Sequence, residues 1–343
     1  MRRALALAAL LLTIAAATGC GAKEEPGNGG SSGKREDLSL VLDYFPNADH
    51  AGIFAAKEAG LYAKAGLDVK IQTPPDPSAP LKLLRAGKAD VAISYEPELL
   101  LARDAGAETL VAVGALVQTP LTSLMALPSG GVKSAQDLAG KRVGTSGIPY
   151  QSAYLKTILE KAGVNPGSVK ETNVGFNLVP AMVSKKVDAT LGAFWNYEGV
   201  QLAPRKPVIL RMEDLGVPTY NELILVARRE SLDAAGASRL RRFITATAAG
   251  HRLVRNDPTV GVDALVKADK GLDRDLQEAA IKATLPVFFP QDDHPWGWME
   301  PVDWANYERW MRANQLLKRP PSEAPPLTNE FLPGEGLGSS ARG

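Results

Sequence analysis

Residues 84–93 read LRAGKADVAI, and residues 183–191 read VSKKVDATL. Each stretch joins the end of a helical pattern to a Lys-x-Asp turn, at Asp90 and Asp188, and then to a short apolar strand. A chance match between two short segments is one explanation, and a chain with two similar α/β lobes is the other. Because open α/β sheets bind ligands at the carboxyl ends of their strands, two such lobes predict a cleft lined by loops from both.

Apolar runs and helical patterns alternate around these two stretches, which is typical of βα units. Strands are expected at residues 38–42, 67–72, 91–94, 109–115, 141–145, 169–174 and 222–227. Helices are expected from Asn47 or Asp49 to Ala59 and at residues 81–86, 98–105 and 150–162. The sequence therefore predicts an α/β fold of two lobes, each a mostly parallel sheet flanked by helices.

The chain is expected to cross between the lobes twice, at stretches rich in turn residues. The first crossing is placed near residues 128–131 and the return near residues 218–221. Lobe one then comprises residues 37–128 and 221–333, and lobe two comprises residues 129–220. Two crossings form a hinge, which suits a cleft that closes on its ligand.

The end of the chain carries aromatic residues at helical spacing. After Asp303, a good N-cap, the helical spacing is kept by Trp304, Tyr307, either Trp310 or Met311, and Leu317. This pattern predicts a C-terminal helix docked on the core rather than an aromatic cofactor box. Residues 334–343 are rich in Gly and Ser and are expected to form a disordered tail.

Composition excludes several classes of protein. With 343 residues, 45% apolar and 22% charged side chains, the chain is globular rather than intrinsically disordered. Its 39 basic and 38 acidic side chains give a net charge of +1, so no nucleic-acid partner is expected. The sequence contains no P-loop and no H-E-x-x-H motif, and residues 144–147 (GTSG) lack the spacing of a nucleophile elbow. These absences favour a binding protein over an enzyme, and no cofactor or metal is expected.

The N-terminus has the pattern of a secretory signal peptide over residues 1–19, with Arg2 and Arg3 before an apolar segment. That segment, residues 4–17, is shorter than the ~20 residues that span a bilayer as a helix. The Ala-Thr-Gly-Cys ending resembles a bacterial lipobox, which implies a diacylglycerol on Cys20, the single cysteine. The alternative is an ordinary signal peptide with an incidental cysteine. Residues 20–36 are expected to form a flexible tether.

Several segments together resemble one family, the thiamine-pyrimidine-precursor binding proteins, over about residues 38 to 333. The segments are 42–53 (LDYFPNADHAGI), 57–62 (KEAGLY), 65–69 (AGLDV), 86–95 (AGKADVAISY), 173–181 (NVGFNLVPA), 192–198 (GAFWNYE) and 328–333 (TNEFLP). Members of this family are periplasmic-type binding lipoproteins of ABC importers, related to sulfonate and nitrate binders. The resemblance implies a type II periplasmic binding protein fold, with two α/β lobes joined by two crossover strands.

The same resemblance implies a function and its partners. The chain is expected to be a monomer that captures an aminopyrimidine thiamine precursor and delivers it to a permease and its ATPase. It would be lipid-anchored at the outer face of the bacterial cytoplasmic membrane. The alternative keeps this transport role with another cargo, namely a flavin such as riboflavin, a cytosine-like base, or an alkanesulfonate, taurine or nitrate.

The family also contains an enzyme, the fungal synthase that builds the thiamine pyrimidine from its own histidine and pyridoxal phosphate. This synthase places a lysine after the strand at residues 91–93 and a histidine four residues later. Here those positions are Ser94 and Glu98, and the synthase's cysteine-rich iron motif has no counterpart. The chain is therefore expected not to be an enzyme.

An aminopyrimidine needs aromatic faces to stack on and a carboxylate or amide to read its edge. Tyr44, Tyr95 and Trp195 follow strands and are expected to stack on the ring, the alternative being burial beneath the loops. Glu198 is expected to bind the amino group and a ring nitrogen, the alternative being a solvated helix start.

Further polar residues follow the same strands. Asp43 and Asn47 precede the first helix, where each either contacts the ligand or caps the helix. Ser94 precedes Tyr95 and is counted with the cleft. In lobe two the loop with Thr145, Ser146 and Tyr150 either binds a polar or anionic substituent or forms a tight turn.

Overall fold

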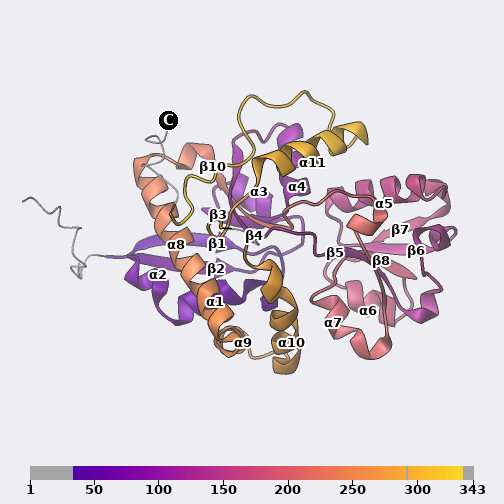
Figure 1. The fold of residues 1–343 in the computed structure, drawn as a ribbon, viewed down its shortest axis with the longest axis horizontal. Helices are drawn as coiled ribbons and strands as arrows, with labels where there is room; N and C mark the ends of the chain where they lie inside the picture. Colours follow the sequence, from indigo (N-terminus) through magenta and orange to yellow (C-terminus); the bar gives the residue numbers. More distant parts are fainter. Residues whose placement is uncertain (1–33, 291–292, 335–343) are drawn as a thin grey trace, which may run out of the picture. The chain divides into compact units, whose positions relative to one another are not determined.

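Two five-stranded sheets carry the fold, each flanked by helices (Figure 1). The computed structural model describes residues 34–290 and 293–334. The expected signal peptide, Cys20, the tether up to residue 33 and the tail from residue 335 lie outside the described residues. Within the described part, no helix combines the length and the apolar character needed to cross a bilayer.

Sheet A has the order β2-β1-β3-β10-β4, and sheet B has the order β7-β6-β8-β5-β9. The strands of sheet A are β1 (Glu36–Val41), β2 (Leu67–Gln72), β3 (Val91–Ser94), β4 (Leu110–Val117) and β10 (Leu223–Arg228). Those of sheet B are β5 (Thr122–Ala126), β6 (Arg142–Thr145), β7 (Lys170–Asn173), β8 (Ala189–Phe194) and β9 (Val208–Arg211). We call sheet A with its helices lobe one, and sheet B with its helices lobe two.

The helices fill the gaps between strands, as expected for βα units. The α-helices are α1 (Ala51–Glu58), α2 (Leu61–Lys64), α3 (Pro80–Arg85), α4 (Glu96–Asp104), α5 (Pro149–Lys161), α6 (Leu178–Val183), α7 (Glu198–Gln201), α8 (Ala234–Asn256), α9 (Pro258–Ala268), α10 (Arg274–Thr284) and α11 (Pro301–Ala313). Helices α1, α8 and α9 pack against one another in lobe one, and α6 and α7 contact β8 in lobe two. The α/β prediction is confirmed.

Asp90 and Asp188 occupy equivalent positions in the two sheets. Asp90 Oδ2 accepts a hydrogen bond from the Ser39 backbone N–H at 2.8 Å, which ties the start of β3 to β1. Asp188 Oδ2 accepts one from the Arg142 backbone N–H at 2.9 Å, which ties β8 to β6 in the same way. Together with the matching strand orders, this confirms that the repeated Lys-x-Asp stretches mark two similar lobes.

Each sheet is mixed, with one strand antiparallel to its two neighbours. That strand is β10 in sheet A and β5 in sheet B. Both are the first strand after a crossing. The chain leaves one sheet at the carboxyl ends of its parallel strands and enters the other sheet at the carboxyl ends of that sheet's parallel strands. The entering strand therefore runs antiparallel to its neighbours.

The first crossing differs from the prediction. It lies at residues 118–121, because β5 (Thr122–Ala126) already pairs with β8 and β9 in sheet B. The turn expected near residues 128–131 exists as a 3-10 turn, Pro128–Gly130, but it follows β5 inside lobe two. The return crossing lies at residues 212–222, between β9 and β10, and includes the predicted stretch.

The C-terminal helix α11 buries Trp304, Tyr307 and Met311, as its spacing predicts. Its N-cap is Glu300, whose side chain accepts from the Val302 N–H, rather than Asp303. Pro301 explains the earlier start, since proline is favoured in the first turn of a helix, where its missing N–H is not needed.

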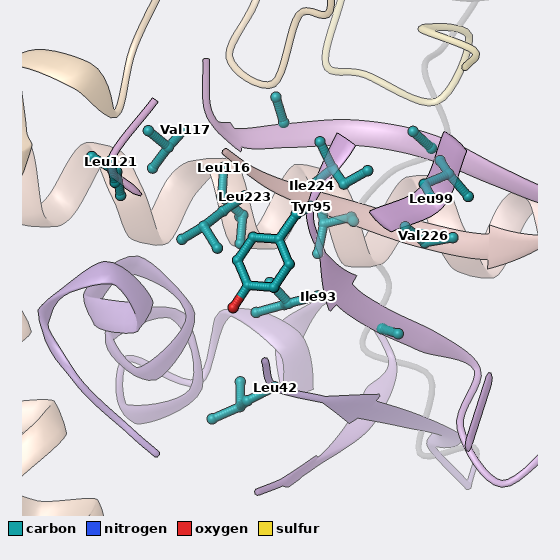
Figure 2. Packing of buried hydrophobic residues seen from close by; sticks show 14 of the residues in the cluster. Leu42, Ile93, Tyr95, Leu99, Leu116, Val117, Leu121, Leu223, Ile224 and Val226 are labelled. Carbon is teal, nitrogen blue, oxygen red and sulfur yellow. The ribbon is translucent and has the colours of Figure 1, made fainter. Parts of the chain in front are cut away.

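The core of lobe one reaches directly to the edge of sheet A. Figure 2 shows the ring of Tyr95 among apolar side chains of β3, β4 and β10, including Ile93, Leu116 and Ile224. Burial of this ring holds its hydroxyl group at the carboxyl end of β3. The hydrophobic core thereby positions a polar atom at the edge where the two lobes meet.

One buried carboxylate holds the two crossings together. Glu222 precedes β10, and its Oε2 accepts hydrogen bonds from the backbone N–H groups of Leu121 and Thr122 at 2.7 and 2.8 Å. The same oxygen accepts from the Tyr220 hydroxyl at 3.0 Å, and Oε1 accepts from Thr122 Oγ1 at 2.9 Å. The hinge is therefore a hydrogen-bonded unit rather than two independent linkers.

We predict that Glu222→Leu destabilises the protein far more than Glu222→Gln. Leucine leaves two buried N–H groups without an acceptor, at about 1–3 kcal/mol each. Glutamine keeps one oxygen for those donors and presents its amide to the Thr122 hydroxyl, so its cost should stay within about 1 kcal/mol. Urea unfolding of the three proteins measures the difference, and equal losses for both variants would contradict this role of Glu222.

Candidate functional site

A cavity lies where the carboxyl ends of β1, β3, β6 and β8 meet. Lobe one lines it with Asp43, Tyr44, Asn47, Asp49, Pro77 and Tyr95. Lobe two lines it with Ser146, Ile148, Tyr150, Gln151, Leu178, Gly192, Phe194, Tyr197 and Glu198. The cavity volume is about 30 Å³. It is therefore much smaller than the ~150 Å³ cavity that holds a benzene molecule.

Asp43 is held from two sides at the end of β1. The Asn47 backbone N–H donates to His50 Nδ1 at 3.3 Å, which leaves the imidazole proton on Nε2. His50 Nε2 then donates to Asp43 Oδ1 at 2.9 Å, and the Tyr95 hydroxyl donates to Oδ2 at 2.7 Å. Both carboxylate oxygens are thus oriented by neighbours within lobe one, and all four side chains are buried.

Asp49 joins the lobes through a buried hydrogen-bond network. Its Oδ1 accepts from Asn196 Nδ2 at 2.6 Å and from Thr284 Oγ1 at 3.2 Å. Its Oδ2 has no hydrogen-bond partner among the described residues, although it is buried. Burial raises the pKa of Asp49 to about 6, and the nearby Asp43 carboxylate adds to this rise.

Glu198 supplies a third carboxylate, from the first turn of α7. Its Oε2 accepts from the Phe194 backbone N–H at 2.8 Å. Burial raises its pKa to about 7, and the charges of Asp49 and Asp43 raise it further against the effect of the backbone hydrogen bonds. Three acidic side chains therefore face one cavity, and none of the residues lining it is a lysine or an arginine.

Aromatic rings form much of the remaining wall. The ring centroids of Tyr95 and Tyr150 lie 5.6 Å apart, and those of Tyr95 and Phe194 lie 6.4 Å apart. Tyr44 donates its hydroxyl across the cleft to the backbone oxygen of Phe176 at 2.8 Å. Burial raises the pKa of Tyr44, Tyr95 and Tyr150, so their hydroxyl groups stay protonated and remain hydrogen-bond donors. Flat aromatic faces and acidic edges together suit a flat ligand that carries hydrogen-bond donors.

The sequence profile of the family described as NMT1/THI5 like matches residues 47–260. The chain belongs to this family. A Haemophilus influenzae relative named for thiamine biosynthesis is 37% identical over 255 residues, which cover 74% of this chain and 80% of the relative. The formylaminopyrimidine-binding protein of Halalkalibacterium halodurans is 31% identical over 296 residues, which cover 83% and 87%.

Other NMT1/THI5-like relatives carry an enzyme name. The 4-amino-5-hydroxymethyl-2-methylpyrimidine phosphate synthase of Legionella pneumophila is 25% identical over 310 residues, which cover 88% of this chain and 94% of the synthase. Among solved structures, the alkanesulfonate-binding protein SsuA of Xanthomonas axonopodis pv. citri superposes with a TM-score of 0.66. It is 17% identical, and the match covers 87% of this chain and all of that one. At this identity the likeness shows the periplasmic binding protein fold alone.

Seven of the ten residues predicted for the site of this NMT1/THI5-like chain line the cavity together. They are Asp43, Tyr44, Asn47, Tyr95, Ser146, Tyr150 and Glu198. For Asn47, the two alternatives coexist, because its side chain also caps the helical turn Ala48–His50. Whether these seven side chains contact a ligand stays a prediction.

Three predicted residues do not line the cavity, and the side chain of each forms a hydrogen bond elsewhere in the protein. Ser94 donates to Glu98 Oε2 at 2.5 Å, and Thr145 donates to Glu171 Oε1 at 2.9 Å. Trp195 donates its indole N–H to the Pro120 backbone oxygen at 3.0 Å, and its ring lies under the guanidinium of Arg211. Stacking of Trp195 on a ligand is therefore not supported, and Phe194 and Tyr197 are the aromatic residues of this segment that reach the cavity.

Several residues that line the cavity were not predicted from the sequence, and Asp49 is the most important of them for the charge of the cavity. It stands two residues after Asn47 in a helix-start pattern, where an aspartate is readily explained as a cap. Gln151 lies one residue after Tyr150 and packs closely against Gly192. A Cβ at position 192 would lie 2.4 Å from Gln151 Nε2, and the φ of +121° there also favours glycine.

No group of three or more His, Cys, Asp or Glu side chains in the described residues has metal-binding geometry.

We predict that the ligand-free protein becomes less stable as pH rises from 6 to 8. Burial raises the pKa of Glu98, Glu198 and Glu222 to about 7 in the folded state, above the value of about 4.3 expected in the unfolded chain. The folded state therefore binds more protons in this window, and stability is lost as pH rises through 7. His251, whose pKa burial lowers to about 3, acts in the opposite direction only below about pH 6.5.

Thermal unfolding between pH 6 and 8 tests this sign. The midpoint should fall with rising pH, and Glu198→Gln should reduce the slope because it removes one of the carboxyl groups whose pKa burial raises. A midpoint that stays constant or rises over this range would contradict the assignment.

Proposed function

We propose that this chain is the substrate-binding lipoprotein of an ABC importer and captures an aminopyrimidine-type thiamine precursor between its lobes. The observation that carries the proposal is the cavity itself, which combines Asp43, Asp49 and Glu198 with aromatic rings and contains no basic side chain. An aminopyrimidine offers two flat faces, an exocyclic amino donor and ring nitrogens. It therefore complements aromatic walls and acidic edges.

The same charge pattern argues against the anionic cargoes. A sulfonate, taurine or nitrate would bring negative charge against three acidic groups with no cation among the lining residues to offset it. A flavin is disfavoured by size, because its three fused rings need much more added volume than a single pyrimidine ring, and the cavity measures only about 30 Å³. Entry of a pyrimidine already requires the lobes to separate at the hinge formed by residues 118–121 and 212–222.

Glu198 is the group best suited to read the ring edge. A carboxyl group and an amino group next to a ring nitrogen form two parallel hydrogen bonds when the pair holds one proton, either on the carboxyl group or on the ring. The pKa of about 7 means that the free protein supplies this proton below neutral pH. Asp43 and Asp49 then face other donor groups of the ligand.

Relatives support the pyrimidine branch. One relative at 31% identity is named for binding a formylaminopyrimidine, and another at 37% is named for thiamine biosynthesis. A cytosine-like base also carries an amino group next to a ring nitrogen. Among the alternative cargoes it therefore fits this cavity best.

The proposal assigns no catalysis to the chain. The Ser94 and Glu98 side chains, which stand where the fungal synthase has its lysine and histidine, hydrogen-bond to each other at 2.5 Å outside the cavity wall. Neither side chain forms a Schiff base. A search for turnover of the bound ligand by the purified protein tests this point, and product formation would overturn it.

Calorimetry with 4-amino-5-hydroxymethyl-2-methylpyrimidine tests both the cargo and the role of Glu198. We predict a dissociation constant that is constant below pH 6.5 and rises about tenfold per unit well above pH 7, since Glu198 then loses the shared proton. Glu198→Gln should bind the ring with little pH dependence, because an amide offers one donor and one acceptor at every pH.

The matched control is Glu160→Gln, which removes an exposed carboxylate on α5 and should leave the wild-type profile unchanged. Binding of taurine or nitrate but not of the aminopyrimidine would reject the cargo. A wild-type affinity independent of pH from 6 to 9 would reject the role of Glu198.

The membrane attachment is tested separately. We predict that the full chain expressed in a bacterium fractionates with membranes and incorporates labelled fatty acid, and that Cys20→Ala abolishes the label and releases the protein. Ser31→Ala, in the same expected tether, is the control and should change neither result. Membrane association that survives without Cys20 would contradict a lipid anchor at this position.

A further inference from the structure

A second hollow, which we call the basic groove, adjoins the cavity. Its volume is about 680 Å³, within the usual range of small-molecule sites. It is defined chiefly by Leu81, Arg85, Leu101, Pro149, Leu316 and Lys318. Helices α3 and α4 of lobe one, the start of α5 in lobe two and the segment after α11 therefore all contribute to it.

A thin wall separates the basic groove from the cavity. In lobe one, Pro77 lines the cavity and the next residue, Ser78, lines the groove. In lobe two, Ser146 and Ile148 line the cavity, while Gly147 and Pro149, which alternate with them, line the groove. Each lobe contributes its own part of this wall, residues 77–78 from lobe one and residues 146–149 from lobe two, so the boundary between the lobes runs through the wall.

The charge of the groove is opposite to that of the cavity. Arg85, Lys318 and Arg319 line it, and their side chains form no hydrogen bond or ion pair with any described residue. The acidic Asp104 is already occupied, since its Oδ1 accepts from the backbone N–H groups of Lys318 and Arg319 at 3.0 and 2.8 Å. Glu98 is buried and paired with Ser94.

We infer that the basic groove holds an anionic substituent, such as a phosphate ester, of a ligand whose aminopyrimidine ring lies in the cavity. This inference rests on the proposed function and extends it to the substrate class. The cavity, with its acidic side chains, accepts the ring, and the groove, with its three unpaired cations, accepts the anion. The wall between them parts during loading, so that one molecule can occupy both compartments.

Calorimetry at pH 6.5 compares the bare 4-amino-5-hydroxymethyl-2-methylpyrimidine with its phosphate and diphosphate esters. We expect at least one ester to bind the wild type at least tenfold more tightly than the bare ring. This advantage should shrink as salt is raised, because it depends on charges near the surface. The double variant Arg85→Gln/Lys318→Gln should lose the advantage while binding the bare ring within twofold of wild type.

Lys186→Gln is the matched control, since it removes an exposed lysine of lobe two that does not line the groove. It should retain the advantage of the ester. If the bare ring binds and neither ester gains affinity, or if the gain survives in the double variant, the groove inference is wrong and the proposed function stands. If neither the ring nor its esters bind at all, the proposed function fails together with the inference.

Discussion

The hydrogen bonds of Glu222 are the interaction on which the arrangement of the lobes depends. Its carboxylate lies at the start of β10 and accepts from both backbone N–H groups at the start of β5. β5 and β10 are the strands that follow the two crossings between the sheets. A second residue of the return crossing, Asn221, donates to the Gln118 backbone oxygen and accepts from the Trp304 indole N–H. The two crossings are therefore coupled to α11 through a buried polar unit.

This crossing geometry also determines where function can lie. Because the chain enters each sheet at the carboxyl ends of the parallel strands, the hinge and the loops after β1, β3, β6 and β8 share one edge. Asp43 and Tyr95 come from lobe one and Glu198 from lobe two, each shortly after or at the end of such a strand. A change in the arrangement of the lobes would change the separation of these side chains, which couples the proposed ligand binding to closure.

The fold was largely predictable, and the site only partly. Apolar runs indicate most of the strands, because buried parallel strands leave a continuous apolar signal, but β5 and β9 were not among the predicted strands. The first crossing was misplaced because a turn signal does not say which sheet the next strand joins, and only pairing of β5 with β8 settles it. The direction of the Trp195 side chain cannot be predicted for a similar reason: after a strand ends it depends on the loop, and here the indole N–H donates to the Pro120 backbone oxygen. Asp49 was missed because its pattern also fits a cap, and its partner Asn196 lies in the other lobe.

The distribution of charge suggests how the site distinguishes cargo from competitors. Asp43 and Asp49 belong to lobe one and Glu198 to lobe two, so closure of an unloaded cleft brings like charges together. Burial is the main cause of the raised pKa of Glu198, and the charges of both aspartates add to it. A ligand that presents hydrogen-bond donors to both lobes removes the repulsion, whereas an anion inside the cavity increases it. Under the proposed function, specificity comes from a penalty on wrong cargo as much as from contacts with the right one. The hydroxyl groups of Tyr44, Tyr95 and Tyr150 stay neutral, so they supply hydrogen-bond donors without changing the charge of the cavity.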